Sequence, residues 1–80
     1  MKYKVLIIDD SISILNTLKS FIQKDNNIDV FTAKSLKSAK EIFISEGNKF
    51  DVILADLGLP DAPNGEVVEY LSNYSIPIVI

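Results

Sequence analysis

The chain has 80 residues, of which 48% are hydrophobic and 24% charged, a composition typical of a small globular domain rather than a disordered segment. Eleven acidic residues against eight basic ones, all of them lysine, give a net charge of −3, which argues against a nucleic-acid backbone as the partner. Cysteine and histidine are absent, which excludes disulfides, Cys-ligated zinc and histidine-activated nucleophiles and leaves oxygen ligands for hard cations.

The amino-terminal apolar run, residues 5–8, is only about four residues long and ends in two aspartates, so it fits neither a signal-peptide core nor a membrane span. Eighty residues leave room for one domain and not for a second. We therefore expect a single domain, residues 1–80, that is cytoplasmic and does not contact a membrane.

The first half of the chain predicts a strand, a helix and a second strand. Residues 3–8 form an almost unbroken apolar run, as in a strand that is covered on both faces of a parallel sheet. Ser11 is a possible cap for a helix whose apolar positions recur at helical spacing up to Lys24. Residues 25–27 break this helix, and residues 28–33 form a shorter strand.

A second helix and a third strand come next. Ser35 opens the helix, its lysines form a solvated face, and Gly47 with Asn48 stops it. Residues 50–55 form an apolar third strand. The segment 56–64, which contains two prolines, is a shaped loop and no regular element.

The last part of the chain predicts a third helix and a fourth strand. The helix has its inward-facing side chains at Val67, Val68, Leu71 and Tyr74. Residues 76–80 form an apolar strand that contains Pro77. Strands that alternate with helices indicate right-handed crossovers and a parallel sheet. The predicted fold class is therefore α/β with a doubly wound parallel sheet.

Two of the predicted strands end in aspartate: Asp9 and Asp10 follow the first strand, and Asp56 follows the third. Functional sites of open parallel sheets lie beyond the carboxyl ends of the strands, so neighbouring strands bring these three side chains into one cleft. Like charges so close are costly unless a cation lies among them. The predicted cation is Mg²⁺, which prefers oxygen ligands.

Asp56 is also the best-placed nucleophile. A carboxylate can attack phosphorus and give an acyl phosphate, while a bound divalent cation neutralises the charge on the transferring group. Gly58, two residues further on, is a flexible position where a backbone carbonyl can turn inward as an additional metal ligand.

Simpler roles account for several of these residues. An aspartate after a strand is often the cap of the next helix, which explains Asp9 or Asp10 taken alone but not the pair together with Asp56. Asp61 is expected to be a turn residue beside Pro60. The aromatic residues expected in the core are Phe43, Phe50 and Tyr74.

Two stretches of the chain carry a family resemblance: Val5-Leu-Ile-Ile-Asp-Asp-Ser11 and Phe50-Asp-Val-Ile-Leu-Ala-Asp-Leu-Gly-Leu-Pro-Asp61, with Gly65 and Ile76-Pro-Ile-Val-Ile80 after them. They resemble the receiver domain of two-component response regulators, a flavodoxin-like module that accepts phosphate from a sensor histidine kinase. The resemblance covers the whole chain in order and implies the strand order 2-1-3-4.

The resemblance also implies roles for the acidic residues. Asp56 is the phosphoacceptor, Asp10 a direct magnesium ligand, and Asp9 a ligand through water or a charge-setting neighbour. Gly58 lends its backbone carbonyl to the metal. Phosphoryl groups come from a histidine kinase, a phosphotransfer protein or a small phosphodonor and are lost by hydrolysis. The chain is then a signalling module and not an enzyme, and at most catalyses its own phosphorylation and dephosphorylation.

Two departures from the family pattern bear on function. One additional residue separates Asp56 from Gly65, which implies a reshaped loop before the third helix. The chain also stops at Ile80, where the family continues with a Ser or Thr, a fourth helix, a fifth strand that opens with a Lys, and a fifth helix. In the family that hydroxyl and ammonium contact the phosphoryl oxygens, so we expect residues 1–80 alone to be phosphorylated poorly or to give no signal.

The stop inside an apolar strand predicts either a fragment of a longer receiver or a homodimer that covers the exposed sheet edge or truncated face with a second copy. The alternative function is therefore a degenerate receiver that serves dimerisation or protein interaction without phosphotransfer. An aspartyl phosphatase that uses magnesium is a distant third, because such enzymes carry a second Asp where this chain has Gly58.

Overall fold

The computed structural model of the protein describes residues 2–47 and 49–80. Its elements, in chain order, are β1 (Tyr3–Ile8), α1 (Ile12–Ile22), β2 (Ile28–Ala33), α2 (Leu36–Glu46), β3 (Val52–Ala55), α3 (Glu66–Leu71) and β4 (Ile78–Val79). The strands form one parallel sheet in the order β2-β1-β3-β4. The predicted α/β class, doubly wound sheet and strand order 2-1-3-4 are confirmed.

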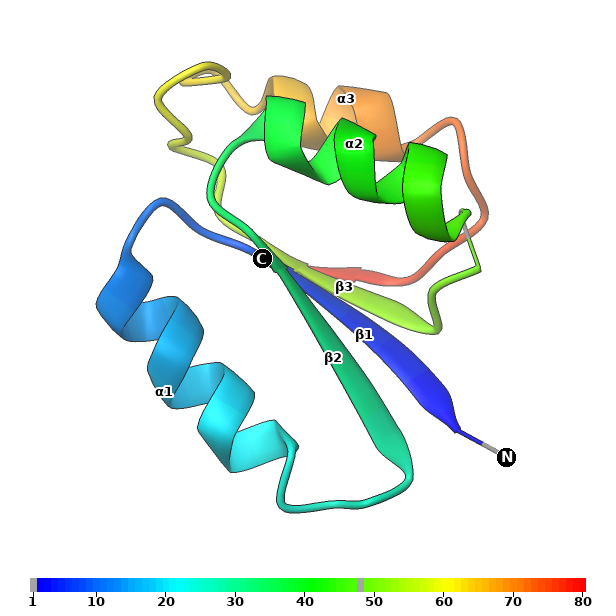
Figure 1. Ribbon diagram of the computed structural model, residues 1–80. Coiled ribbons are helices and arrows are strands. Elements are labelled where there is room, and N and C mark those ends of the chain that lie inside the picture. Colours follow the sequence, from blue (N-terminus) through cyan, green and yellow to red (C-terminus); the bar gives the residue numbers. More distant parts are fainter. Residues whose placement is uncertain (1, 48) are drawn as a thin grey trace.

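The sheet separates two apolar layers. Helix α1 covers one face, and helices α2 and α3 cover the other (Figure 1). Because successive side chains of a strand point to opposite faces, Val5 and Ile7 of β1 pack toward α1, whereas Leu6 and Ile8 pack toward α2 and α3. All four side chains are buried, which explains why the sequence of β1 is apolar without interruption.

Strand β3 is shorter than the sequence predicts. We expected a strand over residues 50–55, but the ladder begins at Val52. The carboxylate of Asp51 accepts a hydrogen bond from the Lys4 amide at 2.7 Å, and so takes a donor that a ladder carbonyl would otherwise bind. The boundary is therefore set by a side chain and not by hydrophobicity.

Strand β4 is also shorter than predicted. Of residues 76–80, only Ile78–Val79 pair with β3. Pro77 has no N–H to donate, and it contributes to the ladder only through its carbonyl, which accepts from the Ile53 amide at 2.9 Å. A proline at the start of an edge strand is the position where the sheet tolerates it.

Helix α1 begins as predicted and ends earlier. The hydroxyl of Ser11 caps it by accepting from the Ile14 amide at 3.3 Å. The helix ends at Ile22 and not at Lys24, because the Lys24 amide donates three residues back, to the Phe21 carbonyl at 3.4 Å. The last turn is tightened in this way, as is common at helix ends.

Helix α2 has the predicted ends. The hydroxyl of Ser35 accepts from the Ser38 amide at 3.0 Å and caps the helix. At the other end Gly47 adopts a φ of 80°, a backbone conformation that favours glycine. Asn48, which we expected to help stop the helix, lies outside the described residues.

Helix α3 is a short element whose inner side is fixed by Val67 and Leu71, both fully buried. Tyr74, expected on this helix, lies in the turn that follows it, where its amide donates to the Leu71 carbonyl at 3.0 Å. Its ring still packs against the core. In the part of the chain that the structure describes, no helix is long and apolar enough to cross a membrane.

Five aromatic rings form a continuous cluster in the layer of α2 and α3: Phe31, Phe43, Phe50, Tyr70 and Tyr74. Centroids of neighbouring rings lie 5.0, 5.6 or 5.8 Å apart. Phe43 and Phe50 are buried, as predicted, and Tyr74 is partly buried. These aromatic residues contribute to the core.

Candidate functional site

The neighbouring strands β1 and β3 bring the predicted acidic residues together. Ile8 stands opposite Ala55 in the register, and the Asp56 amide donates to the Ile8 carbonyl at 2.9 Å. The Asp9 amide likewise donates to the Ala33 carbonyl of β2 at 3.0 Å. Asp9 and Asp56 therefore leave the sheet side by side at its carboxyl edge.

Three carboxylates meet at this edge. Asp9, Asp10 and Asp56 each offer one oxygen, and these oxygens all lie within 4.8 Å of one another. Asp9 and Asp56 are half-buried, whereas Asp10 is exposed. The predicted convergence is thus present. Neither Asp9 nor Asp10 is the cap of the next helix, because Ser11 is the N-cap of α1.

Both strand-end aspartates are held by their own loops. Oδ1 of Asp9 accepts from the Ser11 amide, and Oδ1 of Asp56 accepts from the Gly58 amide, each at 2.9 Å. A bond to an amide two residues ahead fixes the carboxylate relative to the backbone. The second oxygen of each carboxylate has no hydrogen-bond partner within residues 2–47 and 49–80 and can bind a ligand.

No ammonium group balances the three carboxylates among the described residues. The ion pair found there joins Lys2 Nζ to Asp29 Oδ1 at 3.3 Å, and both residues lie near the amino ends of their strands. Three like charges in a partly desolvated place repel one another, and a bound cation relieves this repulsion. A donor set made only of carboxylate oxygens suits a hard cation.

The spacing of the oxygens fits Mg²⁺. Ligands of one Mg²⁺ lie about 2.1 Å from it, so two direct ligands are at most about 4.2 Å apart. Oxygens within 4.8 Å of one another can therefore supply two direct ligands and a third through a water molecule. This arrangement agrees with the waters that Mg²⁺ usually keeps in proteins.

Gly58 contributes its backbone amide to this site, and the role of its carbonyl as a metal ligand stays a prediction. Among the described residues a positive φ occurs at Gly47 and Gly65, and Gly58 is not one of them. A Cβ added to Gly58 would lie 3.7 Å from Asp56 Oδ1, an ordinary van der Waals contact. The observed contribution of Gly58 is the amide that anchors the Asp56 carboxylate.

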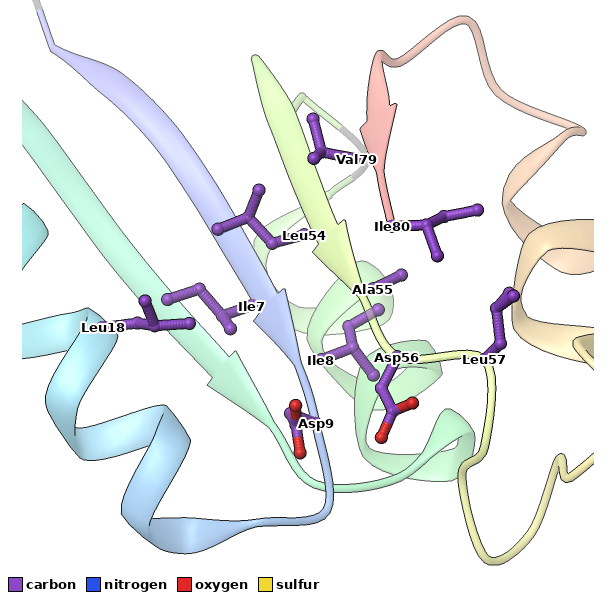
Figure 2. A pocket seen from close by; sticks show the side chains of 10 residues that line it. All are labelled: Ile7, Ile8, Asp9, Leu18, Leu54, Ala55, Asp56, Leu57, Val79 and Ile80. Carbon is purple, nitrogen blue, oxygen red and sulfur yellow. The ribbon is translucent and has the colours of Figure 1, made fainter.

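A cavity of about 550 Å³ opens beside the acidic residues (Figure 2). Figure 2 shows Asp9 and Asp56 at the ends of their strands, with apolar side chains from α1, β1, β3 and β4 around the remaining space. These apolar side chains are Ile7, Ile8, Leu18, Leu54, Ala55, Leu57, Val79 and Ile80. The acidic site therefore borders an apolar surface, which the sequence pattern alone did not reveal.

Two lysines near the amino terminus lie away from this site. Lys2 pairs with Asp29, and the Lys4 ammonium lies 5.2 Å and 5.1 Å from the ring centroids of Phe31 and Phe50. Lys4 stands five residues before Asp9 on β1, a separation of about 16 Å along a strand. Both lysines thus belong to the amino edge of the sheet.

Asp61 is expected from the sequence to be a turn residue, and the structure gives it a partner in another element. Its two carboxylate oxygens accept from the Leu36 and Lys37 amides, each at 2.9 Å, in the first turn of α2. These hydrogen bonds, first that of Leu36, hold the pKa of Asp61 below its ordinary value of 3.8. The contact spans 25 residues of sequence, so no local pattern signals it.

Comparisons with known proteins point to one family. A sequence profile of the response regulator receiver domain matches residues 5–80. A two-component response regulator of rice, Oryza sativa subsp. japonica, is 26% identical over 78 residues, which make up 96% of this chain and 13% of the rice protein.

Solved structures share the fold. The non-phosphorylated HemR receiver domain from Leptospira biflexa matches with a TM-score of 0.82 and 26% identity over 96% of this chain and 61% of that one. The chemotaxis response regulator CheY4 of Vibrio cholerae matches with a TM-score of 0.80 and 32% identity, over 98% of this chain and 66% of that one. The anti-anti-sigma factor PhyR from Bartonella quintana matches with a TM-score of 0.75 and 26% identity, over 98% of this chain and 32% of that one.

The chain thus spans 13% of the rice regulator and 61% of the HemR receiver domain. Within this chain, the profile extends from residue 5 to residue 80, and so includes most of β1 and the elements from α1 to β4. Receiver domains are signalling modules and not enzymes in the ordinary sense. The chain belongs to the receiver domain family of two-component response regulators.

Proposed function

We propose that the chain is the phosphoacceptor module of a two-component phosphorelay, in which Asp56 takes a phosphoryl group from a histidine kinase or a phosphotransfer protein. The observation that carries the proposal is the meeting of three carboxylate oxygens within 4.8 Å at the carboxyl edge of the sheet. Membership of the receiver family supports it.

Asp9, Asp10, Asp56 and the backbone carbonyl of Gly58 would hold the Mg²⁺ ion. As the resemblance to the receiver family implies, Asp10 is the proposed direct ligand and Asp9 the ligand through water. The bound cation supplies positive charge that offsets the charge on the transferring phosphoryl group.

Asp56 is held ready for attack by its own loop. Its Oδ1 accepts from the Gly58 amide at 2.9 Å, which leaves the second oxygen to approach phosphorus. Transfer forms a bond between phosphorus and that oxygen, and breaks the phosphorus–nitrogen bond of a phosphohistidine or the phosphorus–oxygen bond of an acyl phosphate. The leaving group takes the electron pair of the broken bond.

A protein donor fits the surroundings of the site. Exposed apolar side chains flank the carboxylates: Ile12 opens α1 and is 62% exposed, and Leu57 follows Asp56 and is 41% exposed. Side chains of this kind are suited to contact another protein. We place the chain in the cytoplasm with such a donor, and propose no direct contact of this segment with nucleic acid.

The test is phosphorylation of the purified chain by acetyl phosphate with Mg²⁺, read by intact mass. Because phosphorylation of residues 1–80 alone is expected to be poor, we expect a fraction of the wild type to gain one phosphoryl group, and Asp56→Asn to gain none because the nucleophilic oxygen is lost. The matched control is Asp29→Asn, which removes an aspartate that pairs with Lys2 at the other edge of the sheet. This variant should be phosphorylated like the wild type.

Absence of a mass gain in a folded wild type would contradict the proposal and favour the alternative, an interaction module without phosphotransfer. One observation supports self-association in either case. Val79 on β4 is 54% exposed and Ile80 is 72% exposed, and within the described residues β4 pairs with β3 alone. We propose a homodimer through this edge of the sheet and the adjoining apolar face.

A further inference from the structure

The first amides of helix α2 donate hydrogen bonds to acceptors from two separate places in the chain. Ser35, the N-cap, accepts from the Ser38 amide at 3.0 Å. Asp61, from the loop between β3 and α3, accepts from the Leu36 and Lys37 amides, each at 2.9 Å. The first amides of a helix have no partner within it. Here they are shared between a local cap and a distant carboxylate.

The loop that carries Asp61 is the loop that carries the acidic site. Asp61 lies five residues after Asp56. Between them Leu59 is fully buried, and its carbonyl accepts from the Ala62 amide at 3.0 Å, which folds the segment tightly. Gly58, whose amide holds the Asp56 carboxylate, lies inside the same short segment. Asp61 and the residue that holds the Asp56 carboxylate thus lie in one tightly folded segment.

Hydrogen bonds at this edge connect the acidic residues to the neighbouring elements. The Asp56 amide donates to the carbonyl of Ile8, the last residue of β1, and the Asp9 amide donates to the carbonyl of Ala33, the last residue of β2. Among the described residues, the hydrogen bonds that connect the loop after β3 to α2 are the two of Asp61. Asp61 thus connects the loop that carries Asp56 to the first turn of another element.

We propose that Asp61 is a positioning residue of the phosphoacceptor site, a role that rests on the proposed function. Its carboxylate binds the first turn of α2 and so fixes the position of the loop that runs from Asp56 to Asp61. The Asp56 carboxylate and the backbone of Gly58 are thereby held in positions where they can bind a cation. Coupling of this kind is reciprocal. Occupation of the site by Mg²⁺ should therefore tighten the first turn of α2.

The test compares two variants that weaken the same helix end. Asp61→Ala removes the distant carboxylate, and Ser35→Ala removes the local cap without touching the loop after β3. Binding of Mg²⁺ is followed by NMR through the amide shifts of Asp10, Asp56 and Gly58. We expect Asp61→Ala to weaken Mg²⁺ binding about tenfold, as for residues that orient metal ligands. Ser35→Ala should stay within about twofold of the wild type.

A conservative variant separates positioning from simple capping. Asp61→Asn keeps one acceptor oxygen and should lie between the wild type and Asp61→Ala in Mg²⁺ affinity. Hydrogen exchange gives the reciprocal readout: added Mg²⁺ should slow exchange of the Leu36 and Lys37 amides in the wild type and not in Asp61→Ala. Equal Mg²⁺ affinities of the Asp61→Ala and Ser35→Ala variants would overturn the proposal and make Asp61 a helix cap only.

The comparison of Asp61→Ala with Ser35→Ala still tests the positioning role if the proposed function fails. If the wild type binds no Mg²⁺, hydrogen exchange of the Gly58 amide is measured without metal. This amide donates to the Asp56 carboxylate, so its exchange rate reports how firmly that carboxylate is held. Faster exchange in Asp61→Ala than in Ser35→Ala supports positioning, and equal exchange contradicts it. If Asp61→Ala does not fold, the same comparison is made between Asp61→Asn and Ser35→Ala.

Discussion

Asp56 and Asp61 stand in one loop, and their carboxylates bind backbone amides at the same 2.9 Å. The difference lies in where those amides are. Asp56 binds the Gly58 amide of its own turn with one oxygen, whereas Asp61 uses both oxygens on the amides of another element. Because both of its oxygens are used in this way, Asp61 is a structural carboxylate, and Asp56 keeps an oxygen for chemistry.

Tyr70 offers a prediction for a single side chain at high pH. Burial, with the neighbouring Tyr74 hydroxyl, raises the pKa of Tyr70 to about 12 from its ordinary value of 10.0. The folded state thus favours the neutral phenol. This contribution to stability is fully present below pH 10 and is lost as the pH rises through about 12. When phenolate absorbance is followed as the pH rises, we therefore expect a late step near pH 12.

Tyr70→Phe should remove the late step of that titration. Tyr3→Phe is the control, because Tyr3 lies at the start of β1 and is 53% exposed; the late step should persist in it. In concentrated urea the wild type should lose the step as well, since the step depends on burial. A late step that remains in Tyr70→Phe would assign the raised pKa to another group.

At the scale of elements, the sequence predicted the type and order of the elements and the bounds of β1 and β2, but it missed ends of α1, β3 and β4. The alternation of apolar strands with helices was sufficient to predict the seven elements found in residues 2–47 and 49–80, because periodicity reflects which faces are covered. The ends of β3 and β4 depend instead on single hydrogen bonds. Asp51 takes the amide of Lys4, and Pro77 offers only a carbonyl. Contacts of this kind are not visible in a hydrophobicity pattern.

The start of α3 carries a prediction about two glycines. Gly65, which precedes the helix, has a φ of 78°, whereas Gly58 does not adopt a positive φ. An L side chain in the left-handed region costs about 1 to 2 kcal/mol. We therefore expect Gly65→Ala to lower the free energy of unfolding by about that amount, measured by urea denaturation.

Gly58→Ala is the matched control within the same loop. Its new Cβ would lie 3.7 Å from Asp56 Oδ1, an ordinary contact, and the backbone would not be strained. The free energy of unfolding should change by less than about 1 kcal/mol, because an alanine in an allowed conformation also restricts the unfolded chain. A larger loss in Gly58→Ala than in Gly65→Ala would contradict this description of the loop.

At the scale of the whole molecule, the candidate site divides into a part that the sequence predicts and a part that it does not. Asp9, Asp10 and Asp56 were predictable because each directly follows a strand, and parallel strands end at the same edge. The contact of Asp61 with the start of α2, and the position of Leu18 beside the acidic cavity, were not predictable. Their positions depend on tertiary contacts between residues far apart in the sequence.

Self-association is the prediction that concerns the molecule as a whole. Val79→Lys places a charge on β4, and should shift a dimer toward the monomer in sedimentation at micromolar concentration, because charged residues on an edge strand oppose pairing. Ile44→Lys is the control. Ile44 is 85% exposed on α2, in the layer on the other side of the sheet from α1. A well-folded monomer of the wild type under these conditions would count against the dimer.

The five contiguous aromatic rings between β2 and the turn after α3 have an optical consequence. The protein contains no tryptophan, so its near-ultraviolet circular dichroism comes from tyrosine and phenylalanine alone. Rings with centroids 5.0 to 5.8 Å apart sit in a fixed chiral environment. That signal disappears when tertiary packing loosens, even while helices and strands persist. Near-ultraviolet circular dichroism therefore shows, without any added label, whether the side chains in the layer formed by α2 and α3 are packed.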